Sequence, residues 1–185
     1  MHSSYLYFVD GALSAAELSA ARLDGHLVEL GEGYIPADAI ETTHLRAASL
    51  SVLLGDTLAA THLSAAWVFG AIDEAPARHA VQRAVPRRLH HRIDRRFLYR
   101  DGCIETDDLV IVGGVLVTTP PRTAADLARL AGADPASSAA LLGLVSAFPG
   151  VLDSARAWFD AHGPVPGKRD GLAVIDRMRA EVRTT

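Results

Sequence analysis

The sequence Leu109-Val110-Ile111-Val112-Gly113-Gly114-Val115-Leu116-Val117 is the strongest structural signal in the chain. Two runs of aliphatic, mostly β-branched residues flank a Gly-Gly pair. Glycine readily adopts the positive φ angles that a two-residue hairpin turn requires. This stretch therefore predicts an antiparallel hairpin, and the rest of the fold is arranged around it.

Extended structure continues upstream of the hairpin, and helices lie on both sides of it. β-Branched and aromatic residues between turn signals predict strands at 57–61, 79–85, 89–93 and 97–99. Apolar residues at helical spacing predict helices over 39–54 and 62–72, followed by an all-helical chain after Thr118. The predicted class is α+β, with a mixed α/β domain that has a central antiparallel sheet and C-terminal helices.

The first residues of the chain predict a small module of their own. Ser14 is a suitable helix N-cap with Glu17 three residues later, which together form a capping box. Apolar positions then flank a Gly-Glu-Gly turn within residues 27–35, as is typical of a two-stranded ribbon. We therefore expect a helix-plus-wing module over 1–38 and an α/β domain over 39–185.

Composition indicates a folded protein rather than a disordered one. The 185 residues are 49% hydrophobic and 22% charged, close to the average of globular domains. Cys103 is the only cysteine and cannot form an internal disulfide, which favours a reducing compartment. The N-terminus lacks a secretory pattern, and the longest apolar stretch has about half the length of a membrane helix. We expect a cytoplasmic protein without a membrane partner.

Arginines concentrate between Arg78 and Arg100. Eight arginines and one acid give this segment a charge of +7, so the remainder of a chain with net charge -4 carries -11. Guanidinium forks suit phosphates, and the nearby rings of Phe97 and Tyr99 suit stacking on bases. The candidate nucleic-acid contacts are Arg83, Arg87, Arg88, His90, Arg92, Arg95, Arg96 and Arg100. A strand face that pairs with acids of neighbouring elements explains the same arginines equally well.

Motifs for catalysis are not apparent. A Walker phosphate loop and a Gly-x-Ser-x-Gly elbow do not occur. His90 and His91 face opposite sides of a strand, which disfavours a zinc site. The acidic pair Asp107-Asp108 lies in a predicted turn and indicates solvated turn residues rather than a nuclease metal site. We expect no enzyme activity, no catalytic residues, no cofactor and no metal, with a degenerate nuclease as a minority alternative.

The first helix after the hairpin carries three charged residues on one side. Arg122, Asp126 and Arg129 stand at positions i, i+4 and i+7. Residues at this spacing are neighbours along one helical face, and opposite charges there commonly form ion pairs. We expect a ladder of ion pairs at the surface.

Several landmarks follow one another in an order that resembles a known family. They are a helix and Gly-ending ribbon at 14–36, Leu63-Ser64-Ala65-Ala66-Trp67-Val68-Phe69-Gly70, Leu89-His90-His91-Arg92, and the stretch Val117-Thr118-Thr119-Pro120-Pro121-Arg122-Thr123-Ala124-Ala125-Asp126-Leu127-Ala128. The last of these is the most specific. Over roughly residues 14–130 the chain resembles the AbiEi-type antitoxins of type IV toxin–antitoxin systems, particularly short actinobacterial members.

The resemblance implies both a fold and a function. AbiEi-type proteins are similar to winged-helix proteins fused to a mixed α/β C-terminal domain, and they act as DNA-binding autorepressors that oppose a nucleotidyltransferase toxin. Only one helix precedes the ribbon here, so the winged helix is a reduced one. The leading hypothesis is a nucleic-acid-binding antitoxin or transcriptional regulator, with DNA and a cognate nucleotidyltransferase-type toxin as partners. The alternative is a protein-interaction module whose arginines bind an acidic partner such as that toxin.

Overall fold

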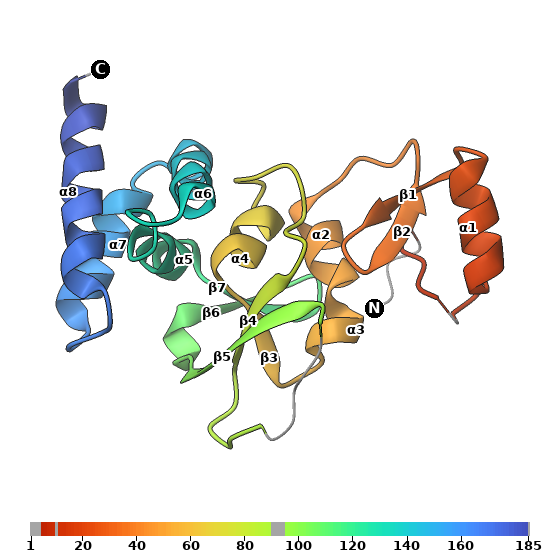
Figure 1. The fold of residues 1–185 in the computed structure, drawn as a ribbon, viewed down its shortest axis with the longest axis horizontal. Helices are drawn as coiled ribbons and strands as arrows, with labels where there is room; N and C mark the ends of the chain where they lie inside the picture. Colours follow the sequence, from red (N-terminus) through yellow and green to blue (C-terminus); the bar gives the residue numbers. More distant parts are fainter. Residues whose placement is uncertain (1–4, 10, 90–94, 185) are drawn as a thin grey trace.

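The computed structural model describes residues 5–9, 11–89 and 95–184. Figure 1 shows three regions in succession: a helix and hairpin near the N-terminus, a central sheet with short helices, and a group of helices that ends the chain. Among the residues described, no single helix is long and apolar enough to cross a membrane. Helices α6 (Pro135–Ala147) and α7 (Val151–Ala161) pass that test only as a pair, with a bend of 114° between them.

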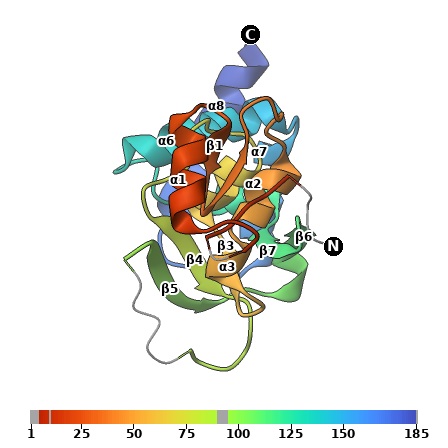
Figure 2. The same cartoon turned by 90° about the vertical axis from the view of Figure 1, so that its right-hand side faces the viewer.

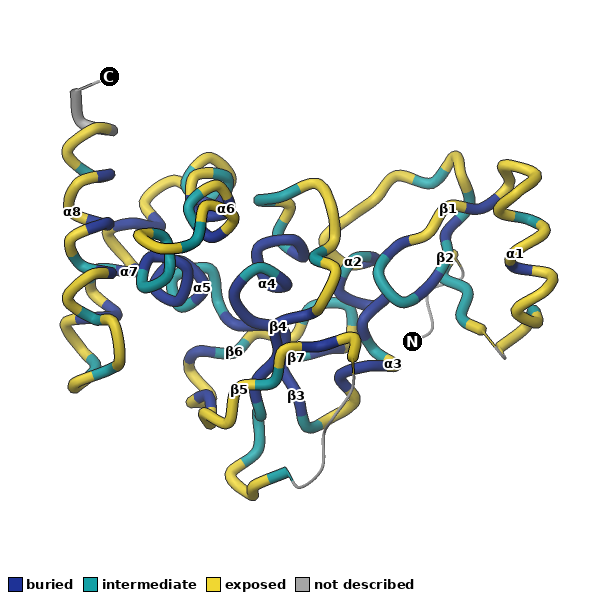
Figure 3. Tube along the Cα trace, viewed as in Figure 1, coloured by how far each residue is buried: buried dark blue, intermediate teal, exposed yellow. Residues whose placement is uncertain are grey.

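The N-terminal region contains helix α1 (Ala15–Leu23) and the antiparallel strands β1 (Leu27–Leu30) and β2 (Gly33–Pro36). The capping box is confirmed, because Ser14 Oγ accepts a hydrogen bond from the Glu17 backbone N–H and the Glu17 side chain accepts one from the Ser14 N–H. Backbone hydrogen bonds between Tyr7 and Tyr34 attach the preceding segment to β2. Helix α1 lies at one end of the molecule in Figure 1 and in the foreground of Figure 2, and most of it is exposed in Figure 3.

The central sheet contains five strands in the order β5-β4-β3-β7-β6. Their bounds are Leu58–Ala60 for β3, His79–Arg83 for β4, Phe97–Cys103 for β5, Leu109–Val112 for β6 and Val115–Thr118 for β7. The predicted α+β class is confirmed, but the sheet is mixed rather than antiparallel. Strand β3 pairs with β7 in parallel, and β4 pairs with β5 in parallel. Alternation along a strand determines which face a side chain takes, whereas it does not determine the direction of the neighbouring strand.

The predicted Gly-Gly hairpin is confirmed. Strands β6 and β7 pair antiparallel, with Val112 opposite Val115. Gly113 and Gly114 have φ angles of 57° and 83°. At Gly113 a Cβ atom would lie 2.4 Å from the carbonyl oxygen of His44. Glycine is therefore required there twice, by the turn and by the close approach of helix α2 (Thr43–Ser49).

Two hydrophobic cores hold the chain together. The sheet core includes Leu30, Ile35, Trp67, Val81 and Val117, so the N-terminal hairpin packs into the same core as the sheet. Helices α2, α3 (Ser51–Leu54) and α4 (His62–Val68) contribute to it. The one helix predicted over 39–54 is present as two helices, α2 and α3, and the helix predicted over 62–72 is present as α4, which ends at Val68. The strand predicted at 89–93 falls almost entirely outside the described residues.

The helix core lies on the C-terminal side. It includes Leu127, Leu144, Trp158, Phe159 and Ile175, which come from α5 (Pro120–Ala128), α6, α7 and α8 (Lys168–Thr184). Helix α5 contacts α4, α6, α7 and α8, so it is surrounded by other helices. Figure 3 shows α4 and α5 as mostly buried. Because Ala66 belongs to the helix core and Trp67 to the sheet core, α4 joins the two.

Candidate nucleic-acid interface and a buried ion-pair network

The arginines of residues 83–100, called the segment arginines below, do not form one continuous patch. Strands β4 and β5 run parallel, so the connection 84–96 returns from the end of β4 to the start of β5. Arg83, Arg87, Arg88 and Arg100 lie toward the ends of these strands, while Arg95 and Arg96 precede the start of β5. His90 and Arg92, two of the predicted contacts, lie outside the described residues.

Arg96 at the start of β5 is joined to the N-terminal hairpin. Its Nη1 donates to Glu32 Oε2 at 2.9 Å, and Glu32 Oε1 lies 3.7 Å from His79 Nε2. His79 Nδ1 is 3.2 Å from Ser64 Oγ. Burial lowers the pKa of His79, and the acid Glu32 only partly offsets that effect. The turn of the β1–β2 hairpin therefore lies beside one end of the segment arginines.

Arg83 at the end of β4 is a structural residue. Its Nη1 donates to the carbonyl oxygens of Val85 and Pro86 at 3.0 and 2.5 Å, and its Nε lies 3.4 Å from Asp101. Arg88 is 3.8 Å from the same carboxylate but has a largely exposed side chain. Asp101 thus partly neutralises two of the predicted nucleic-acid contacts.

Arg87, Arg95 and Arg100 are exposed. Within the described residues no ion pair or hydrogen bond of their side chains is present. These guanidinium groups are the ones that keep their full charge for a partner. The aromatic part of the prediction is wrong for Phe97, because its ring is only 4% exposed and packs in the sheet core. Tyr99 also packs against that core and is half-buried. The ring of Phe97 is therefore not available for stacking on bases, and that of Tyr99 is only partly exposed.

The charged residues of α5 form a buried network, contrary to the predicted surface ladder. Asp126 has no exposed area and accepts hydrogen bonds from Arg122 Nε at 3.0 Å and from Arg129 Nη2. The predicted pairing is correct, but the predicted exposure is wrong. Other helices cover α5 on several sides, so Asp126 is fully buried and the side chains of Arg122 and Arg129 are only 12% and 15% exposed. Arg122 and Arg129 are called the network arginines below.

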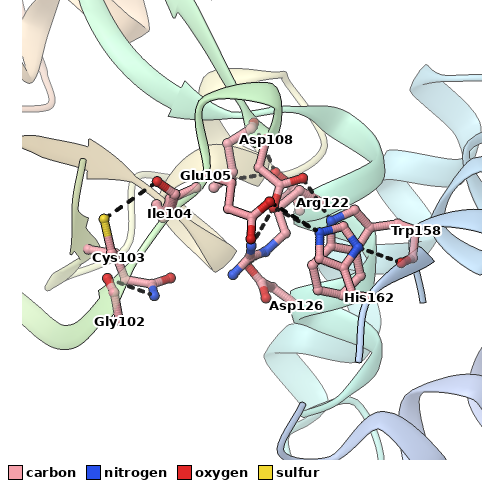
Figure 4. A network of polar contacts seen from close by, with 12 residues as sticks. Gly102, Cys103, Ile104, Glu105, Asp108, Arg122, Asp126, Trp158 and His162 are labelled. Carbon is pink, nitrogen blue, oxygen red and sulfur yellow. Dashed lines mark hydrogen bonds and ion pairs between the residues drawn. The ribbon is translucent and has the colours of Figure 1, made fainter. Parts of the chain in front are cut away.

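Asp108 completes this network, although the sequence predicts a solvated turn residue. It lies in a 3-10 turn, Thr106–Asp108, and is only 5% exposed. Its Oδ2 accepts from Arg122 Nη1 at 2.6 Å, and its Oδ1 accepts from Trp158 Nε1 at 2.7 Å. Figure 4 shows these groups converging from the turn, α5 and α7. Asp108 therefore connects the turn before β6 to helices α5 and α7 through hydrogen bonds that satisfy its buried carboxylate.

Aromatic rings enclose the same network. The Arg122 guanidinium lies 4.8 Å from the centre of the Trp158 ring, which adds a cation–π contact. The His162 ring stacks on Trp158 with centroids 4.1 Å apart. Burial alone lowers the pKa of Arg122, but Asp126 and the hydrogen bond to Asp108 outweigh it, so this pKa lies above its ordinary value. Arg122 is therefore a permanent cation held within the fold.

His62 lies within reach of Arg100 from the segment arginines and of both network arginines, and no sequence motif predicts a role for it. It is buried, and its Nδ1 lies 2.9 Å from Thr61 Oγ1. Its φ angle is +48°, the only positive value for a non-glycine residue among those described. Burial first, and then the charges of Arg100, Arg129 and Arg122, lower the pKa of His62 to about 4, with Asp126 acting in the opposite direction. No sequence pattern marks such a residue, since both its strain and its pKa arise from distant neighbours.

A family model settles the relationship of this fold to known proteins. The model for the AbiEi antitoxin C-terminal domain matches residues 58–155, more than half of the chain. The chain belongs to the family of AbiEi antitoxin C-terminal domains. The predicted resemblance is confirmed. This AbiEi match covers the whole sheet, the segment arginines and the network arginines, whereas Trp158 and His162 lie beyond it.

Other comparisons add little to this AbiEi assignment. A search of the curated proteins finds no match. Among solved structures, the RV2827C protein from Mycobacterium tuberculosis is similar at 18% identity and a TM-score of 0.35, with 90% of this chain and 70% of that chain covered. A likeness at this level carries no argument about function here.

Family membership supports a role in a toxin–antitoxin system, and AbiEi antitoxins are not an enzyme family. An antitoxin domain implies interaction with a toxin or with DNA in general. Within residues 5–9, 11–89 and 95–184, no group of three or more His, Cys, Asp or Glu side chains is placed to hold a metal ion. The buried carboxylates Asp108 and Asp126 are both occupied by arginines instead.

Proposed function

We propose that this AbiEi-family antitoxin binds duplex DNA, with exposed segment arginines contacting the phosphates. The observation that carries the proposal is the exposure of Arg87, Arg88, Arg95 and Arg96 at the two ends of one connection between neighbouring strands. Two of them, Arg87 and Arg95, have no ion-pair partner among the described residues. Unpaired guanidinium groups can bind a phosphate without first breaking an internal ion pair.

Arg88 and Arg96 contribute less to phosphate binding in this proposal than Arg87 and Arg95, because each already has an acidic neighbour. Arg88 lies 3.8 Å from Asp101, a long contact between exposed groups that costs little to break. Arg96 is held by Glu32 at 2.9 Å and exchanges that partner for a phosphate. Arg83 is excluded as a phosphate contact because its guanidinium is committed to backbone carbonyls. The proposal extends to His90 and Arg92, which lie between the two exposed pairs in the sequence.

The N-terminal module is the second part of the proposal. We propose that residues 1–38 act as a reduced winged helix beside the AbiEi domain over 39–185, with the β1–β2 hairpin as the wing. The ion pair from Glu32 to Arg96 supports this placement, since it brings the hairpin turn next to a predicted phosphate contact. Helix α1 carries Glu17 and Arg22 within its bounds and has no surplus of positive charge. The arginines, rather than α1, therefore supply the electrostatic part of binding.

The partners and compartment follow from the same family assignment. We propose a cognate nucleotidyltransferase-type toxin as the protein partner, and the cytoplasm as the compartment. The single cysteine, Cys103, is exposed and free, a state that a reducing compartment preserves. Co-expression of the chain with that toxin should restore growth that the toxin alone arrests.

A binding titration at several salt concentrations tests DNA recognition. Fluorescence anisotropy with a labelled random duplex should show affinity that falls steeply with salt, by about 0.9 log units per log unit of salt for each phosphate contacted. Replacing Arg87, Arg88, Arg95 and Arg96 together by alanine should flatten this dependence. The melting temperature should change little, because exposed charges contribute roughly 0 to 1 kcal/mol each.

The opposite outcome favours a protein partner. If the wild-type chain does not bind duplex DNA at low salt while the quadruple variant loses its affinity for the toxin, the arginines serve an acidic protein surface. If the quadruple variant also melts at a much lower temperature, its arginines are structural partners of Asp101 and Glu32. Both results would overturn DNA binding through the segment arginines.

A further inference from the structure

A pocket of about 400 Å³ lies between the sheet and the C-terminal helices. Gln82, Arg100 and Gly102 from β4 and β5 line one side, while Arg129, Trp158 and His162 line the other. Pockets of this size hold small organic ligands in many proteins. Of the described part of the connection, residues 84–89 and 95–96, none lines this pocket, so the pocket is separate from Arg87, Arg88, Arg95 and Arg96, whereas Arg100 belongs to it.

The pocket contains polar groups that lack partners. Gln82 is 7% exposed, and its Oε1 has no hydrogen-bond partner. Its Nε2 makes one long hydrogen bond of 3.4 Å to the carbonyl oxygen of Gly102. Arg129 also has a buried Nε without a partner. Buried polar groups in proteins nearly always have a hydrogen-bond partner. The amide of Gln82 is held weakly, so a rotation about its last side-chain torsion would allow it to hydrogen-bond to a ligand.

Arg100 is the cation of the pocket that an anion can use. Arg122 and Arg129 also line the pocket, but Asp126 pairs with both of them and Asp108 pairs with Arg122. Glu105, the other lining carboxylate, is largely exposed. Asp108 is already saturated by Arg122 and Trp158. Arg100, by contrast, has no ion pair or hydrogen bond within the described residues, so its guanidinium fork is free to take two oxygens of one anionic group.

His62 adds a neutral ring to the same wall. Its pKa of about 4 keeps the imidazole uncharged near neutral pH, so it can donate or accept a hydrogen bond without adding charge. Its φ of +48° places a strained residue at the pocket, and strain of this kind is frequent at binding sites.

We propose that this pocket binds a nucleoside monophosphate, with the phosphate on Arg100 and an N–H group of the base on Gln82 Oε1. The partly exposed ring of His162 favours a nucleobase over a purely aliphatic acid, because bases stack on such rings. Trp158 is not available for stacking, since His162 and Arg122 lie against its ring and it is only 9% exposed. The nucleotide comes either from the free pool or from the end of a nucleic-acid strand, and both sources share this chemistry. The site goes beyond the proposed DNA surface and does not depend on it.

Calorimetric titration of the full chain tests the site. The probes are AMP, GMP, CMP and UMP, with inorganic phosphate and ribose 5-phosphate as controls. At least one nucleotide should bind with one site per chain, and both controls should bind about tenfold more weakly or worse. A single-stranded oligonucleotide with a terminal phosphate distinguishes the two sources, because it should compete with the nucleotide only if strand ends can enter.

Variants assign the binding to this pocket. Gln82→Leu removes the unpartnered oxygen, and Arg100→Ala removes the free cation; each should weaken nucleotide binding about tenfold or more. Arg95→Ala, another exposed arginine without an ion pair in the described part of the chain, is the matched control and should leave it unchanged. Since Gln82 is buried, Gln82→Leu should not alter the salt dependence of DNA binding, so the two proposals fail separately.

Three results would overturn the nucleotide site. They are no saturable binding up to about 1 mM nucleotide, equal affinity for inorganic phosphate, and unchanged affinity in Arg100→Ala. Because Arg100 is exposed, its variant should fold even if Gln82→Leu does not, and the test therefore stands on Arg100→Ala alone.

Discussion

The segment arginines and the network arginines have the same chemistry but opposite surroundings. Arg87 and Arg95 are exposed and have no ion pair in the described residues, whereas Arg122 and Arg129 share the fully buried Asp126. Arg87 and Arg95 belong to a stretch of sequence rich in positive charge. The network arginines stand at helical spacing on either side of Asp126, which neutralises them. A run of positive charge thus contains both exposed, unpaired cations, such as Arg87 and Arg95, and held ones, such as Arg83, whereas helical spacing to an acid fixes both network arginines.

The largest expected effect comes from the acid shared by the network arginines. Asp126→Ala leaves the partly buried guanidinium of Arg129 without a carboxylate and leaves Arg122 with Asp108 alone, so we expect a loss of about 3–5 kcal/mol in the free energy of unfolding. At roughly 2–4 °C per kcal/mol for a chain of this size, the melting temperature should fall by about 6–20 °C.

Asp101→Ala is the matched control, since Asp101 also pairs with two arginines but is half-exposed. It should cost no more than about 1 kcal/mol. Thermal denaturation of the two variants measures both losses of stability. Equal losses would show that the buried and the exposed carboxylate contribute alike.

A smaller effect is the pH dependence of stability, which follows from the lowered pKa of His62. Its pKa is about 4 in the folded chain and near 6.5 when unfolded. The unfolded chain therefore takes up the proton first as the pH falls. The contribution of His62 to the free energy of unfolding is therefore fully present above about pH 6.5. As the pH falls to about 4 this contribution is lost, and the loss is about 3 kcal/mol at most.

His62→Asn should remove most of this pH dependence, since asparagine tolerates a positive φ and does not titrate. His79, whose pKa is also lowered, contributes a remainder of the same sign. Denaturant unfolding at pH 7 and pH 4.5 measures the difference. A variant that keeps the full acid sensitivity of the wild type would show that His62 is not its source.

The next effect separates members of the segment arginines from each other. Arg83→Ala removes two hydrogen bonds to carbonyl oxygens and a contact with Asp101, so we expect a loss of about 1–2 kcal/mol. Arg87→Ala should stay within about 0.5 kcal/mol, as is usual for exposed residues. Chemical denaturation of both variants tests this division, and equal losses would mean that the connection depends on Arg87 as well.

The sequence predicted those parts of the fold whose causes are local. Gly113 and Gly114 specify a hairpin because few other residues accept their φ angles, and Ser14 with Glu17 specifies a helix start for a similar reason. Strand direction was not predictable in this way. The parallel pairing of β3 with β7 depends on how helices and connections pack, and alternation does not record that.

The site was predictable only in part for the same physical reason. The spacing of Arg122, Asp126 and Arg129 predicted their ion pairs, but their burial depends on helices that follow much later in the chain. Asp108 lies in a turn, as predicted, yet its burial requires Trp158, fifty residues away in sequence. The family resemblance rests mainly on the contiguous stretch 117–128, so it could be found without knowing which distant residues pack together.

The smallest expected change in stability accompanies the most direct test of DNA binding. The measurement is the salt dependence of duplex affinity for Arg87→Ala/Arg95→Ala, compared with Arg169→Ala/Arg177→Ala. Both double variants lose two exposed arginines and the same net charge, but the second pair lies on α8, away from the segment. We expect the first double variant to lower the slope of log affinity against log salt by up to about 2 units and the second to leave it unchanged, with no appreciable change of melting temperature in either. Equal slopes in the two double variants would contradict this expectation, because binding would then follow overall charge rather than the segment arginines.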